Sequence, residues 1–509
     1  MTESSSDTTM KKVPAPKLNL SCLDGLRCIA SLSIILLHVH HFLGALFFPH
    51  DEPCMQALIN IPLIGKLFFN NSFQMPLFWI LSGFLCEYQL DRLVDKKQTQ
   101  QMTRRDYGRF LLNRWLRLYP IYFTFNVINY IGAINNTRDK GGGKICDSFP
   151  KLVESLFFVM RHEPLPATAC AGAGWSVMVD VHGYLVLVLL HACISETWRR
   201  RLVLPALYTM ALGSMAYSTW TLVQERDLVS WKDVQSMLGG AVYSLQYQNS
   251  QDLCLTQTLS GVKDIRGLWA DRGYEFDTEY WNQMVSLRHD ILDQNYFQSV
   301  HKNGSSMFLG SWLYLHLKHR RQITSTVSFY MMQATKLIVA FALLQWTSFC
   351  WMFSGFPVYL FVDVVVSMYN HNHNNLLSKE AWWNQLSSAV SFLFINPLWK
   401  WLAPYTYGIY MSHVLILVLG SVPTTQSRAA RMLAGEDVND TYTLIALLGM
   451  VAKAVLVSWM IAFGLYHTVE WPFRYYRTRY TSSAASASTK TAQQPMMALG
   501  VAIDAKKVN

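Results

Sequence analysis

Two ionisable side chains that could hold an anion and move a proton lie in the first long apolar stretch, residues 23–48. They are Arg27 and His38, eleven residues apart. Eleven residues make close to three helical turns, so in a helix the two side chains share one face, roughly 16 Å apart along the axis. A guanidinium can bind a phosphate, and an imidazole can act as a general base. The alternative is a snorkelling arginine and a core histidine satisfied by a hydroxyl.

Two further guanidinium groups, Arg114 and Arg117, open another apolar stretch. Residues three apart lie on the same helix face, and such a pair suits a phosphate or pyrophosphate, which arginine grips through two parallel hydrogen bonds. Basic residues that merely flank a membrane span on its cytoplasmic side can have the same spacing, and the spacing alone favours that simpler interpretation.

A carboxylate and an imidazole, Asp180 and His182, lie inside the apolar segment that begins at Trp175. A buried acid at such a depth in a membrane helix is costly, and acids in such places usually have a function. The alternative is an aspartate that only pairs with a nearby arginine.

The elements that must position these residues are membrane helices. The 509-residue chain is 51% hydrophobic and only 15% charged, whereas a soluble domain carries roughly 25% charged residues. The apolar residues cluster in stretches of about 17–25 residues, the length that crosses a bilayer. The net charge of +10 comes from short basic clusters between these stretches, which is typical of cytoplasmic loops and excludes nucleic acid as the expected partner.

The hydropathy pattern predicts an all-α, polytopic transmembrane bundle of about ten spans with both termini cytoplasmic. The first span reads as an uncleaved signal anchor. Two segments leave the count open, because span 305–317 is short and the extra apolar run Phe356–Met368 could be a re-entrant or interfacial helix. The predicted spans are about 23–48, 66–90, 110–133, 175–195, 202–222, 305–317, 328–352, 382–398, 404–421 and 442–466.

The spans divide the chain into a cytoplasmic tail (1–18), a membrane domain (19–480) with a long outer loop (223–304), and a second cytoplasmic tail (481–509) that is rich in Ser, Ala and Thr. Both tails have compositions typical of disorder. Several cysteines fall in predicted outer loops, and we expect a disulfide between Cys146 and Cys170. The endoplasmic reticulum or the plasma membrane is the expected location.

Six short motifs occur in a fixed order along the chain. They are Leu23-Asp24-Gly25-Leu26-Arg27 with His38; Phe78-Trp79-Ile80-Leu81-Ser82-Gly83-Phe84; Arg114 to Arg117 with Leu118-Tyr119-Pro120; Trp175-Ser176 with Asp180; Tyr407-Gly408-Ile409-Tyr410 with His413; and Val469-Glu470-Trp471-Pro472-Phe473-Arg474. In these motifs, which span about residues 20–476, the chain resembles the acyltransferase 3 family of membrane acyltransferases. The outer loop 223–304 has no counterpart in that resemblance.

The resemblance implies transfer of an acyl group from cytosolic acyl-CoA to an acceptor hydroxyl, often on the far side of the membrane. His38 falls at the catalytic position, with Asp180 either orienting this base or holding an arginine. Arg27, Arg114 and Arg117 fall at positions tied to donor binding. The remaining motif residues are expected in supporting roles: Ser82, Trp175, Ser176, Tyr410, His413 and Glu470. For Glu470, a purely structural role is equally open.

The expected activity is therefore O-acylation, with acetyl or another short acyl group, of a carbohydrate or lipid-like acceptor. Acyl-CoA is a co-substrate, membrane lipids surround the protein, and no bound cofactor or metal is expected. Many bacterial members have Glu at the position of Asp180. The shorter Asp resembles the animal nose-resistant-to-fluoxetine branch, so the subfamily and the acceptor stay open. A lipid or small-molecule carrier of the same fold is the alternative function, although the sequence shows no convincing internal repeat of the kind common in transporters.

Overall fold

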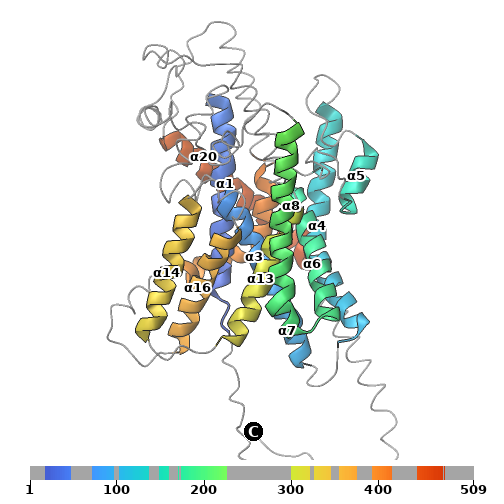
Figure 1. Cartoon of the computed structure of the whole chain (residues 1–509). Coiled ribbons are helices and arrows are strands. Elements are labelled where there is room, and N and C mark those ends of the chain that lie inside the picture. The colour runs from blue at the N-terminus through green and yellow to red at the C-terminus, as the bar shows by residue number, and fades with distance from the viewer. Residues whose placement is uncertain are drawn as a thin grey trace, which may run out of the picture.

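The computed structural model describes residues 18–47, 71–96, 102–136, 148–159, 170, 173–225, 300–320, 326–345, 355–374, 392–414, 416, 444–473 and 475. Within these ranges the chain is helical and contains no strand (Figure 1). The predicted all-α class is confirmed for the part of the chain that the structure describes.

Four described helices are long and apolar enough to cross a membrane. The matching segments are Cys22–Val39, Gly174–Cys193, Val327–Leu344 and Val451–Phe473. They support a membrane protein, while the count of ten spans and the cytoplasmic termini stay predictions. Other long helices are less apolar for a physical reason: α3 (Asn71–Lys96) carries Glu87 and Asp91, which bond to neighbouring helices instead of facing lipid.

The centre of the bundle is the contact between α3 and α13 (Val300–His319). Gly83 of α3 lies against the backbone of Met307, and Gly310 of α13 lies against the backbone of Ile80. A Cβ atom on either glycine would stand 2.0 Å from the facing carbonyl oxygen. Small residues let membrane helices approach this closely, and the reciprocal pair fixes the crossing point of α3 and α13.

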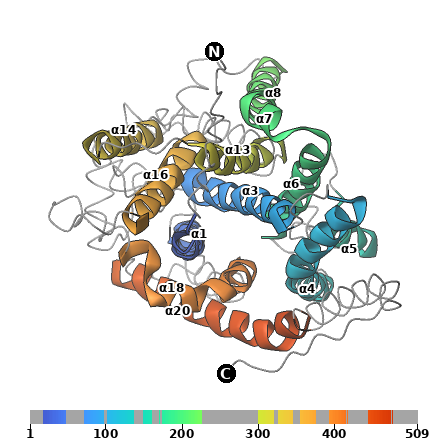
Figure 2. The ribbon, with the colours of Figure 1, turned by 90° about the horizontal axis from the view of Figure 1, so that it is seen from below.

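The functional residues lie on helices that surround α3. Helix α1 (Cys22–Phe47) packs on α3 and on the C-terminal helices α18 (Pro397–Leu402) and α20 (Leu444–Leu465). Figure 2 shows α1 between α3 and this C-terminal group. Helix α6 (Gly174–Cys193) contacts both α3 and α4 (Arg104–Asn136). Short elements complete this region: α5 (Phe149–Leu156), η5 (Ala403–Tyr405) and η6 (Tyr466–Glu470).

Helix α16 (Gly355–Asn374) contains the apolar run that the sequence left open as a re-entrant or interfacial segment. It is a continuous helix of 20 residues, about 30 Å long and thus long enough to span a bilayer. The described part of the expected span 382–398 is interrupted instead, because the helix breaks at Asn396, whose side chain caps the next helix. Residues 382–391 lie outside the described ranges. The number of membrane spans around these two segments stays a prediction.

Helix α14 (Thr326–Gln345) packs chiefly on α16 at the edge of the bundle. Lys336 of α14 forms an ion pair with Asp363 of α16, whose side chain is 2% exposed. Arg320 donates a hydrogen bond to Ser367, which in turn donates to Asp363. A charge pair at such depth holds the two helices together, because separating them would leave ions in lipid.

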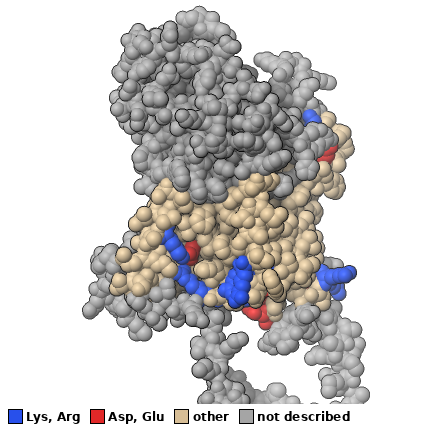
Figure 3. Space-filling view, viewed as in Figure 1, with Lys and Arg blue, Asp and Glu red and all other residues tan. Residues whose placement is uncertain are grey.

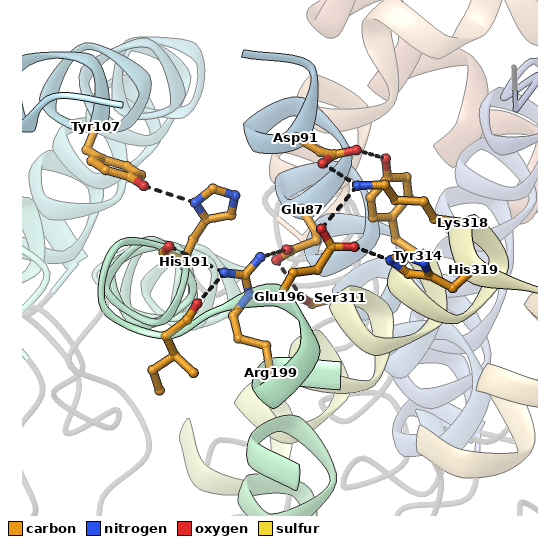
Figure 4. Close-up of polar contacts among 11 residues, drawn as sticks. Glu87, Asp91, Tyr107, His191, Glu196, Arg199, Ser311, Tyr314, Lys318 and His319 are labelled. Atoms are coloured by element: carbon orange, nitrogen blue, oxygen red, sulfur yellow. Dashed lines mark hydrogen bonds and ion pairs between the residues drawn. The ribbon is translucent and has the colours of Figure 1, made fainter. Parts of the chain in front are cut away.

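A second polar cluster joins α3 and α13 to the turn between α6 and α8 (Leu204–Glu225), formed by α7 (Glu196–Trp198) and η2 (Arg199–Val203). Arg199 donates a 2.7 Å hydrogen bond to Glu87, and Ser311 donates to the other Glu87 oxygen at 2.8 Å. Lys318 bonds to Asp91 at 2.7 Å. Figure 4 shows these side chains of α3, α13 and η2 converging.

Lys and Arg side chains on the described surface gather mainly near the end of the bundle where α7 lies (Figures 1 and 3). This distribution agrees with the predicted cytoplasmic side of the membrane. Toward the opposite end, Cys170 is disulfide-bonded, as an oxidising outer compartment would allow. Cys146 lies outside the described residues, so the pairing itself stays a prediction.

Candidate functional site

A cavity between α1, α3, α4, α6 and the helix that starts at Thr406 collects most of the residues singled out in the sequence. It encloses about 800 Å³ of space free of protein atoms, part of it open to the surroundings. The predicted residues that line it are Arg27, Ser82, Arg114, Arg117, Ser176, Asp180 and Tyr410. Residues that are up to 383 positions apart in the sequence thus meet at one place.

Arg114 is the most buried of the three cavity arginines, with 7% of its surface exposed. One guanidinium nitrogen donates to the Leu85 carbonyl at 3.1 Å, and the group lies 5.0 Å from the Tyr184 ring centre and 5.5 Å from that of Phe110. Its Nε has no hydrogen-bond partner. A buried arginine that is held by a carbonyl and two rings, with a donor left over, is suited to bind an anion.

Arg27 lies in the first two turns of α1, where Asp24 is its ion-pair partner at 3.8 Å. This separation is long for a salt bridge, and Asp24 is 39% exposed, so the pair contributes little to stability and leaves the guanidinium available. Arg117 lies one helical turn beyond Arg114 on α4 and also faces the cavity. The same-face geometry expected for the two α4 arginines is therefore present.

Asp180 is the acid in the lining of this cavity. It lies near Ser82 and interacts electrostatically with the cavity arginines, while its Oδ1 is buried without a hydrogen-bond partner. Three guanidinium groups face one carboxylate across the lining, so the wall carries excess positive charge. Of the two roles expected for Asp180, these contacts favour the one in which it holds the arginines.

One part of the cavity wall is formed by hydrogen-bonded hydroxyl groups. Tyr410 donates to Ser176 at 2.9 Å, and Ser176 donates to the Ala173 carbonyl at 2.9 Å. The Tyr410 ring lies 5.6 Å from that of Phe78. Trp175 packs on Trp79, with ring centres 5.6 Å apart. The lining thus contains aromatic side chains as well as the three arginines, so the cavity is amphipathic.

His38 is not among the residues that line this cavity. Its Nδ1 lies 3.0 Å from the Ile34 carbonyl and 3.0 Å from Nε2 of His413. His413 is fully buried, and its Nδ1 bonds to the Tyr410 carbonyl. Because Tyr410 also reaches Ser176, it connects the histidine pair to the cavity wall. The structure thus places the expected base beside the cavity, next to His413 and apart from Asp180.

Glu470 is buried in η6, which packs on α4. It is close enough to interact electrostatically with Tyr407, whose hydroxyl donates to the Leu118 carbonyl at 3.0 Å at the cavity edge. Arg474, the partner that the sequence suggests for Glu470, lies outside the described residues. The position of Glu470 is compatible with either of its expected roles.

Sequence reasoning missed several residues of the site. Tyr184 lines the cavity, but a tyrosine in an aromatic-rich span carries no signal of its own. Tyr407 also lines it; it belongs to one of the six motifs, but no role was assigned to it. The Glu87–Arg199 pair was also missed, although an acid inside an apolar stretch is the signal that singled out Asp180. The contact between His38 and His413 joins residues 375 positions apart, which no local pattern can predict.

Comparison with known proteins adds one finding. The family model of the acyltransferase 3 family, described as an acyltransferase domain, matches residues 20–463, which is most of the chain. The match includes every predicted site residue except Glu470. No curated protein and no solved structure matches the chain.

Proposed function

The chain belongs to the acyltransferase 3 family and is an acyltransferase, and from this membership together with the cavity we propose its reaction. It transfers a short acyl group, such as acetyl, from cytosolic acyl-CoA to a hydroxyl of a carbohydrate or lipid-like acceptor. The reaction takes place in a multi-pass protein of the endoplasmic reticulum or plasma membrane. The family supports the acyl transfer, and the following features of the site support the choice of donor.

The observation that carries the choice of donor is the basic wall of the cavity. Coenzyme A carries phosphate and diphosphate groups, and guanidinium groups bind these through paired hydrogen bonds. Arg114 offers an unpartnered buried Nε, and Arg27 and Arg117 lie on the same wall. All three are on the side of the bundle that the sequence predicts to be cytoplasmic, where acyl-CoA is found.

The amphipathic lining explains how a thioester would be oriented. Phosphates are held at the basic wall, while the acyl end points to the aromatic wall at Phe78 and Tyr410. His38 is eleven residues beyond Arg27, about 16 Å along α1, so a long flexible donor arm is needed to bring the thioester to the base. Coenzyme A has such an arm.

The chemical step follows from general-base catalysis. Nε2 of His38 takes the proton from the acceptor hydroxyl while its oxygen attacks the thioester carbonyl carbon. The new C–O bond forms, the C–S bond breaks, and the proton passes from His38 to the departing sulfur. An ester and free coenzyme A are the products, and the imidazole returns to its starting state.

The test is release of free coenzyme A by purified protein in lipid nanodiscs, given acetyl-CoA or longer acyl-CoAs with a mixture of sugar and lipid acceptors. We expect wild-type protein to release coenzyme A and His38→Gln to be slower by about 10²–10⁴-fold. His182→Gln is the matched control, because His182 makes the same bond to the carbonyl four residues earlier that His38 makes. It should keep wild-type activity.

Donor binding is tested separately by calorimetric titration with coenzyme A. Arg114→Ala is expected to weaken binding, whereas Arg105→Ala, an exposed arginine on the same helix, should not. Wild-type protein that neither turns over any acyl-CoA nor binds coenzyme A through Arg114 would contradict the proposed donor. Movement of a lipid or small molecule through the same bundle would then be the better explanation of the cavity.

A further inference from the structure

The contact between His38 and His413 determines which nitrogen of each ring carries a proton. Three hydrogen bonds are involved: Nδ1 of His413 to the Tyr410 carbonyl, Nε2 of His413 to Nδ1 of His38 at 3.0 Å, and Nδ1 of His38 to the Ile34 carbonyl at 3.0 Å. A carbonyl oxygen can only accept. The two backbone carbonyls at the ends of this chain therefore fix the direction of the bonds between them.

The Tyr410 carbonyl requires a proton on Nδ1 of His413. A neutral imidazole carries one proton, so Nε2 of His413 then has a free lone pair and accepts from its neighbour. The Ile34 carbonyl likewise requires a proton on Nδ1 of His38. Both requirements are met when Nδ1–H of His38 is shared between the Ile34 carbonyl and Nε2 of His413.

The reverse arrangement fails on the same geometry. If His413 donated through Nε2, it would be a cation, and it is 0% exposed. Nδ1 of His38 would then present its lone pair to the Ile34 carbonyl oxygen at 3.0 Å, where two acceptors repel each other. The neutral pair with a bare Nε2 on His38 is the state that satisfies every contact.

We propose that His413 is a positioning residue that holds His38 in the tautomer with a free Nε2 and accepts part of the positive charge when that nitrogen takes a proton. This inference rests on the proposed function, in which His38 is the base. A buried partner that fixes the tautomer of a catalytic histidine is a known device in hydrolases, where it is usually a carboxylate. Here a second imidazole fills that place.

Tyr410 connects this device to the cavity. Its carbonyl accepts from His413, and its hydroxyl donates to Ser176 on the cavity wall. A shift of the helix that carries Tyr410 would therefore move the wall and the histidine pair together. The orientation of the base is in this way tied to the wall that the acyl group is proposed to contact.

The test uses side chains that replace one ring nitrogen of His413 at a time. The carbonyl oxygen of Gln can occupy the place of Nε2 and accept from His38, whereas Asn can donate to the Tyr410 carbonyl but does not reach His38. We expect His413→Gln to keep kcat within about tenfold of wild type and His413→Asn to lose about 10²–10⁴-fold. The KM for acyl-CoA should change little in both.

A merely structural role gives a different result. Gln and Asn would then lower activity in proportion to the loss of thermal stability, and both would do so. Equal activity of the two variants, or a change confined to KM, would overturn the inference.

A second measurement does not depend on turnover. Solid-state NMR of protein with ¹⁵N-labelled histidine in bilayers reports which ring nitrogen of His38 is protonated, with the signal assigned by its loss in His38→Gln. We expect the proton on Nδ1 in wild type and a change of tautomer in His413→Asn. A proton on Nε2 in wild type refutes the inference even in an active enzyme. If the proton is on Nδ1 but the protein transfers no acyl group, the inference about the tautomer stands and only the proposed function is refuted.

Discussion

Removing the carboxylate of Glu87 is expected to destabilise the bundle strongly. Its side chain is 1% exposed, and it accepts hydrogen bonds from Arg199 at 2.7 Å and Ser311 at 2.8 Å. In Glu87→Ala the guanidinium of Arg199 stays buried and keeps only its bonds to the carbonyls of His191 and Ile194. An uncompensated buried charge of this kind typically costs about 3–5 kcal/mol.

Comparison with a double variant shows whether the loss of stability in Glu87→Ala comes from the unpaired buried charge of Arg199 or from the lost hydrogen bonds. Replacing both partners, as in Glu87→Leu with Arg199→Met, removes the stranded charge; what is then lost is the bond from Ser311 and the two bonds to carbonyls, at about 1 kcal/mol each. The double variant should therefore be more stable than Glu87→Ala alone, although it removes more hydrogen bonds. Hydrogen-bond counting without desolvation predicts the opposite order.

Reversible unfolding by SDS in mixed micelles measures these free energies. Asp95→Ala is the matched control, because Asp95 is an exposed acid on the same helix, and it should change the free energy of unfolding by less than about 0.5 kcal/mol. A loss below about 1 kcal/mol in Glu87→Ala, or a double variant less stable than the single one, would refute the reasoning.

Two further predictions concern packing and pH. Gly83→Leu places atoms where a Cβ already lies 2.0 Å from the Met307 carbonyl oxygen, so it should cost at least about 1–3 kcal/mol in the same unfolding assay; wild-type stability would show that α3 and α13 do not meet there. Burial would raise the pKa of Glu196, but the hydrogen bond from His319 and the charge of Lys318 outweigh it and hold the pKa below the ordinary value of 4.5. The stability that Glu196 contributes is thus present above that value and is lost as the pH falls through the lowered pKa. The difference in melting temperature between wild type and Glu196→Gln should shrink on acidification from pH 7, and a difference that grows would contradict the assignment.

The basic wall of the cavity could be predicted from the sequence because charges inside apolar segments are few and expensive. Arg27 and Asp180 stand out on that ground, whereas Arg114 and Arg117 were assigned to donor binding only through the family resemblance. All four line one cavity. The sequence did not indicate whether Asp180 lies beside His38 or beside the arginines, because either group could be its partner. Its contacts put it with the arginines.

The pairing of helices was beyond sequence analysis. A membrane span that is apolar on every side has no amphipathic pattern to mark the face that packs on other helices. The local sequence therefore does not indicate that His413 lies against His38 or that Gly83 and Gly310 oppose each other. Hydropathy left the role of the run Phe356–Met368 open; in the structure it belongs to α16, whose Asp363 is paired with Lys336 of the neighbouring helix.

The ion pair between Lys336 and Asp363 has a consequence for how the chain enters the membrane. Lys336 is synthesised first, and its partner follows 27 residues later. Alone in lipid, α14 would expose an ammonium group to hydrocarbon at a cost of a few kcal/mol. We therefore expect α14 to remain at the insertion machinery until α16 arrives, and the two helices to leave it together as a hairpin. Assembly of this edge of the bundle then begins during synthesis, before the C-terminal helices that complete the site have been made.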